Sequence, residues 1–306
     1  MIKQINITKY IKPFVVLVFM IGVCLLYFQP TYAENAVDLK GLTLSPLRTE
    51  LEISPGTSLD GVLTVKNSTD KPMTVSLTAE EFSVINQQYD YAFTAESDMA
   101  KWVRFAPVEV DLAVGETKDV KYSVGVPLSA EPGGRYISLF ASTDTASSNS
   151  AVKSRQRVAS LLYITVSGQV TRVGSLVSLS SPWLISGTSS WSAALRNSGT
   201  THFRSRYDIQ VLNIIGNDIA ASNLGDDLIL PGTVRSVYGD LPLPKFPGIY
   251  KVIYNVGLGD SPAVVETRYV LYMPWYAMIF FIVLIILLIS TIVRKVRRKR
   301  HKNQSV

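Results

Sequence analysis

The 306-residue sequence is poor in the side chains that most catalytic and metal sites need. It has one cysteine, Cys24, and two histidines, His202 and His301, and these three residues lie far apart in the chain. Zinc ligands at motif spacing, a glycine-rich phosphate loop, a nucleophile elbow and calcium-binding loops are missing. We therefore predict a protein that is not an enzyme and that uses no cofactor and no metal. A wall-modifying hydrolase is the less favoured alternative, because glycosidases need only two of the 24 acidic residues.

Disulfides are also excluded from the folded part of the chain. Cys24 lies inside the apolar run of residues 13–28, which follows Lys3, Lys9 and Lys12 and precedes the small residues of "TYA" at 31–33. This order predicts a secretory signal peptide over 1–33, with an uncleaved N-terminal anchor as the alternative. An exported protein without disulfides must be stabilised by ordinary hydrophobic cores.

A second apolar run, residues 277–293, predicts a transmembrane helix. Trp275 and Tyr276 precede it, as aromatic residues do at a membrane interface. The tail, 294–306, follows with the stop-transfer residues Arg294, Lys295, Arg297, Arg298, Lys299 and Arg300. By the positive-inside rule, we expect a single-pass cell-membrane protein with a cytoplasmic tail and an extracellular ectodomain.

Outside the two termini, basic residues are outnumbered by acidic ones. Residues 34–276 contain 20 basic and all 24 acidic residues, so the ectodomain carries a net charge of −4. The sequence pI of the whole chain, about 9.2, therefore reflects membrane topology, and nucleic acid is not an expected partner.

The ectodomain alternates apolar and polar residues with period two, as in "MTVSLTA" (73–79) and "YKVIYNV" (250–256). This pattern is typical of antiparallel strands with one buried face. Asn-Ser turns occur at 67–68 and 197–198. Each is followed by a Gly-x-Thr (115–117) or Gly-Thr (232–233) element and then by a Pro-Gly-x₂-Tyr or Pro-Gly-x-Tyr element. The repeated order predicts an all-β fold with two tandem immunoglobulin-like β-sandwich domains, over 40–167 and 168–273, the second next to the membrane.

Aromatic residues are concentrated in an insertion of the first domain, residues 83–102. Sugars are commonly held on exposed aromatic faces beside amide groups. We therefore predict ligand binding by Gln87, Gln88, Tyr89, Tyr91 and Trp102. The alternative is an additional buried strand, because aromatic residues at alternate positions are also typical of strands.

Two segments resemble a known family. "SPGTSLDGVLTVKNSTDKPMTVSL" (54–77) and "VEVDLAVGETKDVKYSVGVPLSAEPGGRYISLF" (108–140) are similar to the first domain of the WxL-interacting proteins of Gram-positive cell surfaces. The resemblance implies a peptidoglycan-binding first domain and a partner-binding second domain. The strand pattern is also similar to pilus chaperones and other bacterial immunoglobulin-like domains. We thus expect a surface protein that binds peptidoglycan, a surface protein or both, with a chaperone or scaffold for surface-protein assembly as the alternative.

Overall fold

The computed structural model describes residues 41–145, 154–222 and 225–303, so the predicted signal peptide lies outside the described residues. The chain divides into two units. One unit runs from Leu39 to Met273, and the other contains the C-terminal helix. Each unit is described by itself.

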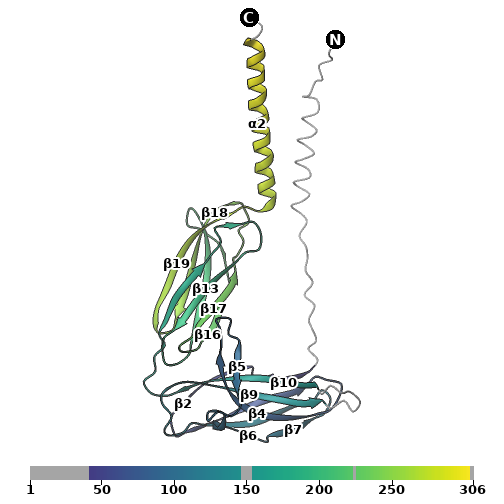
Figure 1. The fold of residues 1–306 in the computed structure, drawn as a ribbon, viewed down its shortest axis with the longest axis vertical. Helices are drawn as coiled ribbons and strands as arrows, with labels where there is room; N and C mark the ends of the chain where they lie inside the picture. The colour runs from purple at the N-terminus through teal and green to yellow at the C-terminus, as the bar shows by residue number, and fades with distance from the viewer. Residues whose placement is uncertain (1–40, 146–153, 223–224, 304–306) are drawn as a thin grey trace. The chain divides into compact units, whose positions relative to one another are not determined.

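The strands from residue 42 to residue 166, here called module one, form a β-sandwich (Figure 1). One sheet has the order β1-β3-β8-β6, and the other has the order β2-β10-β9-β4-β5, with β7 also pairing with β4. The element bounds are β1 Leu42–Ser45, β2 Arg48–Ile53, β3 Ser58–Asn67, β4 Met73–Val84, β5 Tyr91–Thr94, η1 Ala100–Trp102, β6 Val103–Ala106, β7 Glu109–Leu112, β8 Thr117–Gly125, β9 Gly133–Thr145 and β10 Ser154–Val166. The alternation predicted over 73–79 is visible in β4, where Val75 and Leu77 are buried in the core.

The strands from residue 174 to residue 272, here called module two, form a second sandwich. Its sheets have the orders β11-β13-β17 and β12-β19-β18-β14-β15, and β16 also pairs with β14. The bounds are β11 Gly174–Ser180, β12 Leu184–Ile185, β13 Ser190–Asn197, β14 Phe203–Asn213, β15 Asp218–Ala221, β16 Gly225–Ile229, β17 Val234–Asp240, β18 Gly248–Leu258 and β19 Ser261–Tyr272. Trp191, Tyr254 and Leu195 are among the residues of its core.

The repeated Asn-Ser turn has the same geometry in both modules. Asn67 and Asn197 are fully buried, and each side-chain oxygen accepts a bond from the backbone N–H two residues later, at 2.9 and 2.8 Å. Each side-chain amide donates to the carbonyl four residues later, Lys71 in one module and Thr201 in the other. A buried amide is favourable only when its bonds are satisfied, so each turn needs asparagine at this position.

The C-terminal helix, α2, runs from Trp275 to Asn303. Its first part, Trp275–Arg294, has a mean hydropathy of 3.0 and is long enough to cross a membrane. The predicted span, 277–293, lies within it, and the stop-transfer residues lie in its last turns. The predicted fold class is confirmed: two immunoglobulin-like β-sandwiches followed by one apolar helix. Orientation across the membrane stays a prediction.

Candidate functional site: the cleft between the modules

The loop between β4 and β5, residues 85–90, joins the two modules, and we call it the clamp loop. Its Tyr89 is only 5% exposed and packs with Leu228 and Leu230 of module two. The Tyr89 hydroxyl accepts a bond from the Leu230 N–H (2.8 Å) and lies 2.7 Å from the Thr233 hydroxyl. The Arg235 guanidinium lies 4.4 Å from the centre of the Tyr89 ring. These contacts fasten module one to module two.

Gln87 contributes to the same fastening through its backbone. Its carbonyl accepts a 2.7 Å bond from the Ser236 N–H, on the outer edge of β17. The Gln87 side-chain oxygen also accepts a 3.3 Å bond from the Ser236 hydroxyl. Tyr89 has a φ of 66°, a left-handed value that aromatic residues rarely adopt. The clamp loop is therefore held in one conformation by its contacts across the interface.

The five predicted ligand-binding residues do not form one surface. Tyr89 is buried between the modules, which removes its ring from the exposed aromatic face that we expected and gives it an interface role instead. Trp102 packs against the module-one core from the end of η1. Gln88 is exposed, and Tyr91 on β5 stacks edge-on against Phe82 at 5.5 Å. A ligand-binding role for these residues stays a prediction.

Tyr91 lines a groove of about 550 Å³ on module one. The other lining residues are Leu47, Arg48, Phe93, Ala159 and Leu161. The groove is mostly apolar, and Phe93 is well exposed in it. Tyr91 and Phe93 of the predicted aromatic surface are accessible to a ligand in this groove.

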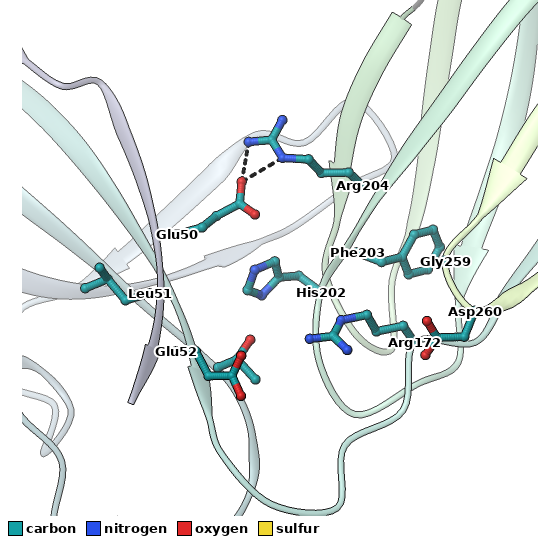
Figure 2. Close-up of a pocket in the computed structure, with 10 residues that line it drawn as sticks. Glu50, Leu51, Glu52, Arg172, His202, Phe203, Arg204, Gly259 and Asp260 are labelled. Carbon is teal, nitrogen blue, oxygen red and sulfur yellow. Dashed lines mark hydrogen bonds and ion pairs between the residues drawn. The ribbon is translucent and has the colours of Figure 1, made fainter. Parts of the chain in front are cut away.

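A second cavity, of about 410 Å³, lies in the cleft between the modules (Figure 2). Glu50 and Glu52 enter it from β2 of module one. His202 and Asp260 line it from turns of module two, and Arg172 lines it from the segment that connects β10 to β11. A pocket of this volume is in the range that holds a small ligand or a few residues of a peptide.

The two arginines of the cleft differ in their partners. Arg204 binds Glu50 of module one through Nε at 2.8 Å, and it binds Asp226 through Nη1 at 2.8 Å. The hydrogen bond to Glu50 raises the pKa of Arg204, which therefore stays charged. Arg172 makes no side-chain hydrogen bond or ion pair with the described residues, although it lines the cavity. Within the described part of the chain, its guanidinium is therefore available to a ligand.

His202 lies at the back of the cleft and belongs to the interface. Its ring packs against Tyr136 and Tyr163 of module one, with ring centres 5.7 and 5.5 Å apart. The Tyr136 hydroxyl lies 3.4 Å from His202 Nδ1. Burial lowers the pKa of His202 to about 4. The Glu50 carboxylate opposes this shift, and the charges of Arg172 and Arg204 add to it. The imidazole is therefore neutral at physiological pH.

Sequence reasoning missed the cleft, because its residues come from several separate segments. The only signal was that His202 is the one histidine of the ectodomain and follows the second Asn-Ser turn. Among residues 41–145, 154–222 and 225–303, no group of three histidine, cysteine or acidic side chains could hold a metal ion.

The comparisons with known proteins found likeness in structure but not in sequence. No protein-family model and no curated protein matches the chain. The class 5 fimbriae chaperone CfaA is 12% identical with a TM-score of 0.38, over 74% of this chain and 99% of that one. A complex of the Salmonella enterica SafA pilin with the SafB chaperone is 10% identical with a TM-score of 0.39, over 76% of this chain and 99% of that one. The CsuC–CsuE chaperone complex of Acinetobacter baumannii Csu pili is 11% identical with a TM-score of 0.37, over 76% of this chain and 99% of that one. Because these TM-scores are low, we argue function from the chain's own geometry.

Proposed function

We propose that this chain is a membrane-anchored cell-surface protein that binds another surface protein and acts as a scaffold or chaperone in its assembly. In this proposal α2 spans the membrane, the basic tail is cytoplasmic and the two modules lie outside. The bound segment of the partner occupies the cleft between the modules.

The observation that carries the proposal is that the Arg172 side chain pairs with none of the described residues, in a cleft that exists before any ligand binds. A planar guanidinium binds a carboxylate through two parallel hydrogen bonds, or backbone carbonyls through single ones. Such a bond is stronger in a partly buried site, where fewer water molecules compete with it. Glu52 and Asp260 also line the cavity and can accept bonds from peptide N–H groups. A peptide offers both kinds of partner.

The clamp loop explains why the cleft is preformed. The bonds of Tyr89 and Gln87 to module two, and that of Arg204 to Glu50, join the modules on more than one side. Gly134 N–H also donates to the Thr200 carbonyl at 2.9 Å. A site that is ordered in advance loses less conformational entropy when a ligand binds.

Peptidoglycan is a second candidate ligand, because Tyr91 and Phe93 line an open apolar groove. Sugar rings could stack on these aromatic side chains. This groove is separate from the cleft in its lining residues, so the two proposals can be tested apart.

Site-specific photo-crosslinking in cells separates the candidates. A photoreactive amino acid replaces Glu52 in the cleft, Tyr91 in the groove, or the exposed Val114 in a loop of module one as the control. We expect one defined protein adduct from position 52, none from 114, and the same adduct in isolated membranes. A muropeptide adduct from position 91, with no protein adduct from 52, would replace our proposal with peptidoglycan binding.

A further inference from the structure

Module two exposes large apolar side chains in three of its loops. Its four most exposed apolar residues are Ile215 (81%), Ile214 (78%), Phe246 (74%) and Trp183 (72%). All four lie outside the strands. Side chains of this size are normally buried, and a group of them on a surface marks a contact with something apolar.

The strand register places these loops at one end of the module. Gly248 and Ile185 both pair with Tyr272, the last residue of β19, from its two neighbouring strands. Trp183 is two residues before Ile185, and Phe246 is two residues before Gly248. On the next strand, Asn213 pairs with Tyr250, and the hairpin with Ile214 and Ile215 follows. We call this group of four side chains the apolar tip.

Hydrogen bonds fix the backbone of the three loops that carry the apolar tip. The Tyr250 hydroxyl donates to the Phe246 carbonyl at 2.7 Å. The Asn213 side-chain oxygen accepts bonds from the N–H groups of Ile215 and Asn217, at 3.0 and 2.9 Å. The Trp183 carbonyl accepts a 2.8 Å bond from the Leu271 N–H. The exposure is thus built into the turns.

The opposite end of module two has a different character. Its turns contain "NSGTTH" (197–202) and "PGT" (231–233), and they meet module one through Thr200, Thr201 and His202. One end of module two therefore has polar turns that contact module one, while the other end carries the most exposed apolar side chains of the module. A general excess of surface hydrophobicity does not explain this asymmetry.

We propose that the apolar tip contacts the headgroup region of the lipid bilayer beside α2. Only Met273 and Pro274 separate the end of β19 from α2, so the covalent chain spans at most about 11 Å between Tyr272 and Trp275. Tryptophan and other large apolar residues are favourable at this depth, and Lys245, exposed beside Phe246, suits anionic headgroups. The contact supports module two on the membrane in addition to the single helix. This inference rests on α2 spanning the membrane and is independent of the partner in the cleft.

The test uses the full chain in vesicles of phosphatidylcholine and phosphatidylglycerol, with Cys24→Ser removing the native thiol. An environment-sensitive dye is attached to Ile215→Cys, and to Trp183→Cys as a second position in the apolar tip. Val265→Cys on β19 and Val114→Cys in module one are controls, because both native side chains are more than half exposed. At both tip positions we expect blue-shifted emission, quenching by lipids with a nitroxide near the headgroup, and iodide quenching several-fold weaker than at the controls.

Equal iodide quenching at the tip and control positions would overturn the proposal. Protection of the tip positions from iodide in native membranes, but not in vesicles that contain this chain as their only protein, would also overturn the proposal. That result would assign the apolar tip to a protein partner. Extraction with alkaline carbonate is run on the same samples. Release of the chain by carbonate would show that the anchor itself, and with it the proposed function, has failed.

Discussion

The stability of the folded chain depends on pH through the side chain of His202, which is buried at the interface between the modules. Its pKa falls from about 6.5 to about 4 because the ring is buried between the modules. Between these values the unfolded chain binds a proton that the folded chain does not. Stability is therefore full above pH 6.5 and declines as the pH falls toward 4.

We predict that His202→Asn removes this part of the pH dependence. The wild-type free energy of unfolding should fall from pH 6.5 to pH 4 by up to about 3 kcal/mol more than that of the variant. Denaturant melts of the full chain in detergent at a series of pH values measure the difference. His301, the other histidine, lies in the tail, so it should add little to the slope. Parallel pH profiles for the two proteins would show that His202 is not held neutral by the fold.

Residue roles could be predicted where local chemistry decides them. The Asn-Ser turns could be recognised in the sequence because an asparagine can bond its own backbone within a few residues, and Asn67 and Asn197 do so. The roles of His202 and Arg172 could not be predicted. Their neighbours, Tyr136 and Glu50 among them, are far away in the sequence.

The clamp loop shows how one connecting element joins two modules. The hydroxyl of Tyr89 satisfies the Leu230 N–H and contacts the Thr233 hydroxyl, both in module two. Removing the hydroxyl leaves a buried backbone donor without its partner.

We predict that Tyr89→Phe lowers the free energy of unfolding by about 1–3 kcal/mol, the cost of an unsatisfied buried polar group. Tyr238→Phe is the matched control, because Tyr238 is exposed on β17 and should change stability by no more than about 0.5 kcal/mol. Thermal and denaturant melts of the full chain measure both. A Tyr89→Phe melt that overlays the wild type would contradict the clamp and return Tyr89 to the ligand-binding alternative.

The strands themselves were predictable from their period-two pattern, because each sheet has one buried face. The insertion at 83–102 was ambiguous, and the structure shows why. It contains a true strand, β5, whose Phe93 pairs with Phe82 of β4. It also contains a loop whose contacts lie about 140 residues further along the chain. Spacing within the insertion carries no information about those contacts.

At the scale of the molecule, the sequence predicted the parts but not their junction. The repeated turns indicated two sandwiches, and the apolar run indicated the helix, because both are local patterns. The cleft arises where β2 of module one meets the turns of module two, and so it depends on how the two modules join. The clamp loop makes that junction, and the function that we propose depends on it.

The most direct test of this account is the yield of the protein crosslink from position 52 when Arg172 is replaced by glutamate. The Arg172 side chain bonds no described residue, so Arg172→Glu should fold normally. Arg104→Glu, at an exposed arginine on β6, is the matched control. We predict a fall of about tenfold or more with Arg172→Glu, corresponding to the loss of at least about 1.4 kcal/mol from a charge-assisted bond, and no change with Arg104→Glu. An unchanged yield with Arg172→Glu would contradict the claim that a partner binds in the cleft.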